Sequence, residues 1–180
     1  MRVFWRKGYV ATTVSDLTAA VGINRPSFYA AFDSKEAIFR TVLSRYFAGP
    51  SRFLSEAIDR PTARACVEHM LHGVVNLLTD PSTPSTCLWV HCALSCGDAP
   101  LQGELTVLRA AGHAALSGRF RRAVLEGDLP KGTDADALAQ FIQSVGFGLI
   151  VQASMSATHD QLLCVVETVL LAWPTLIAEH

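Results

Sequence analysis

Charged residues are scarce in this chain. Asp, Glu, Lys and Arg make up 17% of its 180 residues, whereas soluble domains average about 25%. Hydrophobic residues make up 50%, and the mean hydropathy is +0.29. A small monomer leaves much of its surface in water, so it cannot easily bury so large an apolar share. Either a membrane or a subunit interface is expected to cover the excess.

A clean membrane-spanning segment is also missing. A spanning helix needs about 20 mostly apolar residues. The longest uncharged run, residues 137–159, contains several Gln and Ser side chains, and the apolar run 162–178 has Glu167 near its middle, where a carboxylate is costly in lipid. The residues after Met1 are mixed, so no signal peptide is expected. We therefore expect a cytoplasmic protein with a large subunit interface.

Alternating strand patterns are absent, and apolar residues recur at helical spacing almost throughout. Clusters of Pro, Gly, Ser and Asp predict loops at residues 80–85 and 127–132. No repeat or low-complexity tract is present. Beyond residue 50, helices are expected near 51–59, 61–79, 86–96, 100–127, 133–156 and 159–178.

Catalytic patterns are missing as well. No glycine-rich phosphate loop is present, because Gly146 and Gly148 lie inside a helical pattern, where close packing of helices explains them. None of the six His residues is paired with a nucleophile in a recognisable pattern. Five Cys residues in a chain expected in the cytoplasm argue against a disulfide framework. We expect no enzymatic activity and no cofactor.

The net charge, −1 for the whole chain, is unevenly distributed. Residues 1–47 contain seven Lys and Arg and three Asp and Glu, a net charge of +4, whereas residues 48–180 carry −5. A basic N-terminal part on an acidic body suits a protein that presents one end to a polyanion. Ordinary scatter produces the same distribution, so charge alone does not decide.

The most informative stretch is residues 13–32, TVSDLTAAVGINRPSFYAAF. Thr13 with Asp16 three residues later is a variant capping box that predicts a helix start, and Gly22 is typical of a left-handed helix end. Asn24 then predicts the start of a second helix, with a proline in its first turn. Two short helices joined by a tight turn containing glycine form a helix-turn-helix, whose second helix enters the DNA major groove.

Further signals flank this motif. Gly8 is expected to end a short first helix, and Ser34 is expected to cap a fourth helix that ends at Gly49. Phe28 and Phe32 lie four residues apart on the second helix of the motif, and we expect both to pack in the core rather than to contact DNA.

Residues 4–39, FWRKGYVATTVSDLTAAVGINRPSFYAAFDSKEAIF, resemble the DNA-binding domain of the TetR/AcrR family of bacterial repressors. The segment CLWVHCALSC, followed by a long helix and EGDLP, is similar to the ligand domain of one TetR subgroup. The resemblance implies an all-α fold with two domains. Residues 1–47 are the expected three-helix helix-turn-helix domain, its first helix truncated, and residues 48–180 the expected helical domain for ligand binding and dimerisation. The shared residues are Gly8-Tyr9, Thr12-Thr13, Gly22-Ile23, Tyr29, Phe32 and Ser34-Lys35-Glu36.

The resemblance also implies which residues contact DNA, through phosphates for position and base edges for sequence. The alternative for Thr13 is a helix cap alone, and the alternative for Arg25 is a solvated surface charge. The implied contacts are Thr13 and Lys35 on phosphates, Arg25, Pro26 and Ser27 on base edges or the flanking backbone, and Tyr29 on a phosphate or a thymine methyl group.

The small-molecule site is expected in the C-terminal part, where an apolar pocket with a few polar groups is typical. Its candidates, chosen from apolar helix faces, are Trp89, Cys92, Phe120, Phe147 and Met155, with Gln143 or His91 as the polar element.

Three cysteines, Cys87, Cys92 and Cys96, cluster around one short expected helix. They fit packing in the core, where a free thiol behaves as a small apolar group. They also fit a thiol sensor of oxidants or electrophiles, since a neighbouring His91 can lower a thiol pKa. A metal site from Cys92, Cys96 and His91 is the third interpretation, although the spacing matches no zinc pattern.

Together these patterns predict a transcriptional repressor that leaves a palindromic operator when a small-molecule inducer binds. The alternative is a small-molecule-binding helical protein, or a thiol-based sensor, with a weak or vestigial DNA-binding head. The expected helix near 133–156 has one broad apolar face and the one near 159–178 is apolar on two faces, which predicts a four-helix bundle between two copies. We expect Val169 in that interface, with Gly146 and Gly148 allowing close approach.

Overall fold

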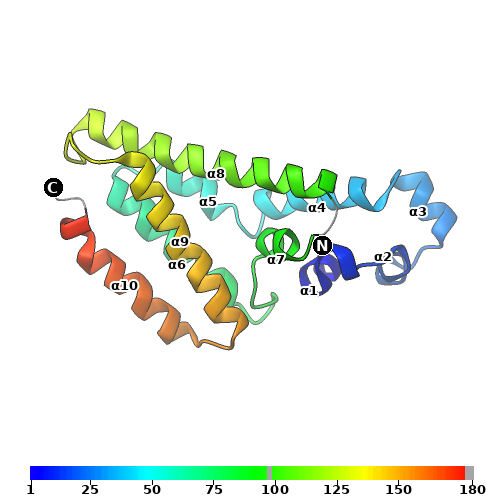
Figure 1. Ribbon diagram of the computed structural model, residues 1–180. Helices are drawn as coiled ribbons and strands as arrows, with labels where there is room; N and C mark the ends of the chain where they lie inside the picture. The colour runs from blue at the N-terminus through cyan, green and yellow to red at the C-terminus, as the bar shows by residue number, and fades with distance from the viewer. Residues whose placement is uncertain (97–98, 177–180) are drawn as a thin grey trace.

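The computed structural model describes residues 1–96 and 99–176 (Figure 1). Within these residues the chain forms ten helices and no strand, as the sequence predicted. The last expected helix included residues 177–178, which lie outside the described residues. The helices are α1 (Arg2–Ala11), α2 (Val14–Val21), α3 (Arg25–Ala31), α4 (Lys35–Ala48), α5 (Phe53–Ile58), α6 (Ala63–Thr79), α7 (Leu88–Ser95), α8 (Ala99–Glu126), α9 (Ala135–Ser154) and α10 (His159–Leu176).

Helices α1, α2 and α3 form a head at one end of an elongated molecule, and α4 leads from this head into the body (Figure 1). The long helix α8 runs along one side of the body, where α9 packs on it, and α10 packs on α6. The short helix α7 lies between head and body and packs closely on α1. The recognition end of the head and the last helix are thus at opposite ends of the molecule.

Local capping sets the boundaries of the head helices as predicted. The Thr13 hydroxyl accepts from the Asp16 N–H at 3.1 Å, and the Asp16 carboxylate accepts from the Thr13 N–H, which completes the capping box of α2. Gly22 ends α2 in the left-handed region, at φ 71° and ψ 29°. Asn24 and Ser34 accept from N–H groups in the first turns of α3 and α4. These four caps satisfy backbone groups that a short helix otherwise leaves to water.

Gly8 breaks the first helix, as predicted. Its backbone is non-helical at φ 73° and ψ 176°, and α1 continues beyond this kink as a second short helical segment to Ala11. A Cβ atom at Gly8 would lie 2.7 Å from Ser95 Oγ and 3.1 Å from His91 Nε2. The kink therefore lets the backbone of α1 lie directly on α7, which only glycine permits here.

Aromatic rings fill the core of the head. Phe4 and Tyr9 of α1 each pack on Phe39 of α4, with ring centroids 5.1 and 5.0 Å apart. Phe28 is fully buried, as predicted, whereas Phe32 is half-buried at the end of α3. This aromatic cluster fixes α1 against α4 and gives α3 a rigid support.

The outer faces of α9 and α10 carry exposed apolar side chains. Val151 of α9 is 51% exposed and Leu171 of α10 is 81% exposed in the single subunit. The placement of Val169 in a subunit interface is wrong, because its side chain is buried within its own subunit at 7% exposure. Among the described residues, α9 alone is long and apolar enough to cross a membrane by length and composition, and it packs on α6 and α8.

The short helix α5 packs along α6, and its closest approach is at Gly73. A Cβ atom at Gly73 would lie 2.2 Å from Cδ2 of the Phe53 ring, so the ring occupies the place of a side chain. Replacing a glycine here overpacks the contact, whereas a mid-helix glycine with open space around it gains helix propensity on substitution.

We predict that Gly73→Ala lowers the free energy of unfolding by about 1–3 kcal/mol, because Phe53 must leave its place on α6. Gly118→Ala is the matched control: it lies in α8 with no atom within 4 Å of an added Cβ. The control is expected to gain up to about 1 kcal/mol. Urea denaturation measures both, and equal midpoints for the two variants would contradict the packing argument.

Candidate nucleic-acid interface and internal cavity

The N-terminal turn of α3 presents polar groups to solvent. Arg25, Pro26 and Ser27 are all exposed, and Tyr29 is 52% exposed one turn further on. Arg25 Nη2 donates to Ser15 Oγ of α2 at 2.7 Å, which holds the guanidinium across the two helices of the motif. The end of a helix that meets base edges in a helix-turn-helix is this N-terminal turn. The arrangement offers one cation and two hydroxyl groups at a convex tip.

Thr13 and Lys35 flank that tip, but both side chains also make hydrogen bonds within the head. The Thr13 hydroxyl is exposed and engaged in the capping box of α2. Lys35 Nζ donates to the carbonyl oxygens of Tyr9 at 3.1 Å and Thr12 at 3.0 Å, and lies 4.2 Å from the centroid of the Tyr9 ring. An ammonium group has three N–H donors, so one remains for a phosphate oxygen after the end of α1 has been capped.

Two carboxylates in the head are stabilised by specific donors. Tyr9 Oη donates to Glu36 Oε1 at 2.7 Å, and this hydrogen bond lowers the Glu36 pKa to about 2. Lys7 Nζ lies 2.6 Å from Asp16 Oδ1, and the hydrogen bond from Lys7 lowers the Asp16 pKa to about 2. Both acids are therefore ionised at neutral pH and stabilise the connections of α1 to α4 and to α2.

The head is attached to the body through α1. Trp5 Nε1 donates to the carbonyl oxygen of Thr86 at 2.7 Å, just before α7. The Trp5 ring packs edge-on against Tyr46 of α4, with centroids 5.1 Å apart. Cys92 Sγ of α7 lies 3.9 Å from the Phe4 carbonyl oxygen. A movement of α7 or of the end of α4 therefore acts directly on the head.

A cavity of about 470 Å³ lies inside the body. It is bounded by the end of α4, by α5, α6 and the start of α7, and by the middle of α8 and α9. Three residues predicted for a small-molecule site line it: Trp89, Gln143 and Phe147. Trp89 and Phe147 meet edge-on with centroids 6.0 Å apart. Gly146 also lines this cavity, with no atom within 4 Å of an added Cβ.

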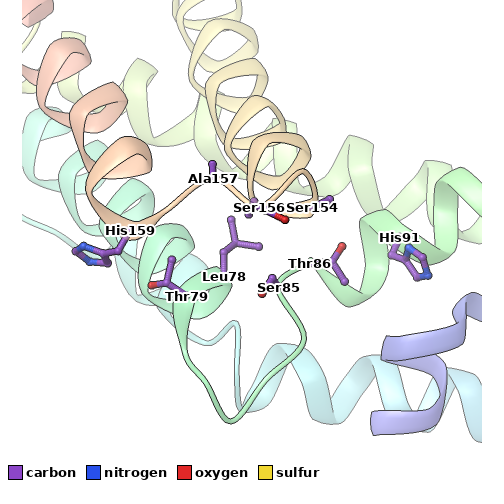
Figure 2. A pocket seen from close by; sticks show the side chains of 10 residues that line it. Leu78, Thr79, Ser85, Thr86, His91, Ser154, Ser156, Ala157 and His159 are labelled. Carbon is purple, nitrogen blue, oxygen red and sulfur yellow. The ribbon is translucent and has the colours of Figure 1, made fainter.

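The other four predicted residues lie elsewhere. Phe120 is fully buried beside Trp173, and Cys92 is fully buried under Phe4 of α1. Met155 is 78% exposed on the outside of α9. His91 lines a separate, open groove of about 700 Å³, where Figure 2 shows hydroxyl side chains from α6, the loop before α7 and the end of α9.

Several lining residues of the cavity were missed from the sequence. Tyr46 and Phe47 stand at the end of α4, in the part assigned to DNA binding, and Phe53 and Leu54 belong to α5. Their apolar character was visible, but no local pattern indicates that the end of α4 faces α9. The cavity joins residues about 100 positions apart in the chain, a relation that helical periodicity does not contain.

The thiol groups of Cys87 and Cys92, at the start and in the middle of α7, are packed in the core. Cys87 and Cys92 are buried, and burial raises the pKa of Cys92 to about 12 and raises that of Cys87 as well. Thiols react as thiolates, which such burial disfavours. Within the described part of the chain, no group of three His, Cys, Asp or Glu side chains is placed to hold a metal ion. Neither the sensor nor the metal interpretation gains support here.

Comparisons with known proteins agree with this geometry. Residues 1–42 match the family model described as bacterial regulatory proteins, tetR family. The HTH-type transcriptional repressor ComR of Escherichia coli (strain K12) is 26% identical over 186 residues, covering 98% of this chain and 86% of that protein. The HTH-type transcriptional repressor BdcR of the same strain is 40% identical over 68 residues, covering 37% of this chain and 34% of that protein.

Among solved structures, a cysteine mutant of the TetR family transcriptional regulator CifR, complexed with 26-bp double-strand operator DNA, is 38% identical. The TM-score is 0.89, and the match covers 96% of this chain and 92% of that one. The similarity therefore extends over both the head and the helical body.

The Tyr9–Glu36 hydrogen bond predicts how the head responds to acid. Because the folded-state pKa of Glu36 is lowered to about 2 from an ordinary 4.5, its stabilisation is complete above that ordinary value and is lost as the pH falls toward 2. Tyr9→Phe is expected to cost about 1 kcal/mol at pH 7, since water screens a partly exposed pair. The Asp16 shift is common to both proteins and cancels in the comparison.

The measurement is the difference in unfolding free energy between wild type and Tyr9→Phe at several pH values from 7 down to 2. The difference should stay constant near neutral pH and shrink as the pH falls toward 2, where Glu36 of the wild type begins to bind a proton. A difference that stays constant over this range would show that Tyr9 acts by ring packing alone.

Proposed function

Because the chain belongs to the TetR family of bacterial regulatory proteins and is a DNA-binding transcriptional regulator, we propose that it represses transcription as a homodimer on a palindromic operator. A small molecule in the internal cavity would release it. The observation that carries this proposal is the exposed polar turn of α3, held on a head that is itself attached to the wall of the cavity. We assign residues 1–47 to DNA binding and residues 48–180 to effector binding and dimerisation.

The two recognition helices of a dimer would enter successive major grooves on one face of the duplex, about 34–36 Å apart. In this arrangement Arg25, Ser27 and Tyr29 meet bases or the adjacent backbone, while Lys35 and Thr13 meet phosphates. Pro26 contributes shape alone, since it has no N–H to donate. The exposure of this turn and the basic charge of residues 1–47 support the assignment.

Effector binding would change the spacing of the two heads through contacts at the cavity wall. Tyr46 lines the cavity, donates to or accepts from Cys87 Sγ at 3.2 Å, and packs on Trp5 of the head. A ligand that favours another arrangement of these side chains shifts the equilibrium between two conformations by its difference in affinity for them. Coupling free energies of this kind are typically about 1–3 kcal/mol.

The dimer would form through the outer faces of α9 and α10. Exposed residues Phe141, Val151 and Met155 recur on one side of α9, and Leu171 lies on the exposed side of α10. Two such helices from each copy make an isologous four-helix bundle, which covers these side chains and accounts for the apolar composition.

We further propose that the protein acts in the cytoplasm and by binding alone, without catalysis. Its curated relatives are transcriptional repressors, and a regulator of this kind works where chromosomal DNA is found.

The DNA-binding proposal is tested by fluorescence anisotropy with an operator selected from a random duplex library, a scrambled duplex and a series of salt concentrations. Arg25→Ala should weaken operator binding by about 1–3 kcal/mol while affecting the scrambled duplex less, since a base contact is lost. Lys35→Ala should weaken both duplexes alike and lower the salt slope by about one unit.

Arg52→Ala is the matched control, because Arg52 is an exposed arginine of α5 that pairs with Glu56 outside the head. It should bind both duplexes as the wild type does. Equal losses on both duplexes for Arg25→Ala would remove its base-reading role, and a wild type that selects no duplex at all would refute the proposal.

The interface is tested by light scattering on three aspartate variants. Leu171→Asp should give a folded monomer, because its side chain is exposed in the single subunit and would be buried only in the dimer. Val169→Asp should unfold the subunit itself, since the carboxylate would be buried without a partner. Val107→Asp, on the exposed side of α8, should remain a dimer. A dimeric Leu171→Asp protein would place the interface elsewhere.

A further inference from the structure

The wall of the internal cavity is apolar, and most of its polar side chains are already engaged. Ser51 Oγ donates to the Tyr46 carbonyl oxygen at 3.1 Å, and Ser55 Oγ donates to the Arg52 carbonyl oxygen at 2.8 Å. The Tyr46 hydroxyl is engaged with Cys87 Sγ. The protons of the two serine hydroxyl groups are therefore used within the wall, and the Tyr46 hydroxyl already has a partner in Cys87.

The two charged side chains of the lining, Asp59 and Arg109, are both exposed to solvent. They have opposite signs and stand at the edge of the cavity, where water solvates them. A charged ligand group would find no partner deeper inside, and an unpaired ion in an apolar interior is strongly disfavoured. The interior therefore selects for an uncharged molecule.

The remaining polar side chain of the wall to consider is the Gln143 amide, whose oxygen already has a partner. Gln143 Oε1 lies 3.2 Å from His113 Nδ1, which donates to it from α8. The other nitrogen of this imidazole lies 3.7 Å from Asp136 Oδ1, and Asp136 is held in turn by Ser117 and by Arg121. With Oε1 turned to the imidazole, the contact is a hydrogen bond only when Nδ1 of His113 carries a proton, and Gln143 Nε2 then points away from His113.

The Gln143 NH₂ group is then available to a molecule in the cavity. No other described residue accepts a hydrogen bond from its Nε2, while the nearby Gly112 on the cavity wall leaves space beside it: a Cβ there would lie 3.8 Å from Nε2. The Trp89 indole N–H is a second donor of the lining that meets no acceptor within the described part of the chain.

We propose that the effector is an uncharged, largely apolar molecule with a hydrogen-bond acceptor, such as a carbonyl or ether oxygen, that receives a hydrogen bond from Gln143 Nε2. The aromatic side chains Trp89, Phe147 and Phe53 surround its apolar part. His113 acts as a positioning residue, because a proton on its Nδ1 holds the amide with its donor toward the cavity. This inference rests on the proposed function, in which the cavity is the effector site.

The test uses two probes of the same shape, 2-acetylnaphthalene and 2-ethylnaphthalene, which differ by the carbonyl oxygen. Isothermal titration calorimetry on the full chain should show that the wild type binds the ketone about five-fold more tightly, since one net hydrogen bond separates the probes. Gln143→Leu should remove the preference and keep the affinity for the hydrocarbon. Gln143→Glu should reverse the preference, because a carboxylate repels the carbonyl oxygen.

Two control variants test whether the probes bind in the cavity and whether the preference for the ketone depends on Gln143. Gln102→Leu changes an exposed glutamine of α8 outside the cavity and should keep the wild-type preference. Gly146→Leu should weaken both probes at least ten-fold, because it fills the cavity from a position where an added Cβ meets no atom within 4 Å. Probes that still bind the Gly146→Leu protein occupy another place, which would overturn the inference.

His113→Phe tests the positioning role separately. It should reduce the preference for the ketone without changing the affinity for the hydrocarbon, since the amide is freed but the apolar wall is kept. Equal affinity of the wild type for the two probes, or no binding of either, would overturn the inferred effector class. Operator binding by the same unliganded protein is measured in parallel, so a failed effector inference is distinguished from a failed assignment as a DNA-binding repressor.

Discussion

The backbone of α1 at Gly8 lies directly against the Ser95 and His91 side chains of α7, and this contact joins the head to the body. A Cβ atom at Gly8 would lie within 3.1 Å of both Ser95 Oγ and His91 Nε2. The Trp5 indole N–H anchors the same stretch of α1 on the Thr86 carbonyl oxygen. Because packed interfaces hold a few discrete arrangements rather than deforming smoothly, the position of α3 on DNA depends on where α7 and the end of α4 lie.

Tyr46 makes that dependence specific. Its ring is fully buried, it forms part of the cavity wall and it packs edge-on against Trp5. Burial raises its pKa above the ordinary value, so the hydroxyl is neutral and keeps its hydrogen bond with Cys87. The side chains that a molecule in the cavity would touch are therefore the ones that hold the head. Long-range communication then needs no contact between effector and α3, only a difference in affinity for two arrangements of this joint.

The low charge and high hydropathy of the chain have three uses in the fold. Apolar side chains fill the core, surround a cavity with few charges, and cover the outer faces of α9 and α10 where Val151 and Leu171 are exposed. Cys92 also acts as a small apolar group. It fits under the backbone of α1, where a larger side chain would separate α1 from α7. The scarcity of charge is thus tied to ligand binding and association.

The sequence by itself determined the helices and the head. Caps such as Thr13 with Asp16, and breaks such as Gly22, act within three or four residues, so the local sequence contains all the groups that decide them. The resemblance of residues 4–39 also indicated the family, because all the residues of the helix-turn-helix motif lie in one short segment of the sequence.

Tertiary structure decided what each helix faces. Periodicity gives the direction of a side chain around its own axis but not the neighbour that meets it, so Val169 was assigned to the wrong side of a helix that is apolar on two sides. For the same reason, of the residues predicted to line a ligand site, Trp89, Gln143 and Phe147 line the cavity, whereas Met155 is exposed to solvent. Gly8 shows both contributions: the glycine itself indicated a break in the first helix, but only the fold places the Ser95 and His91 side chains of α7 against that break.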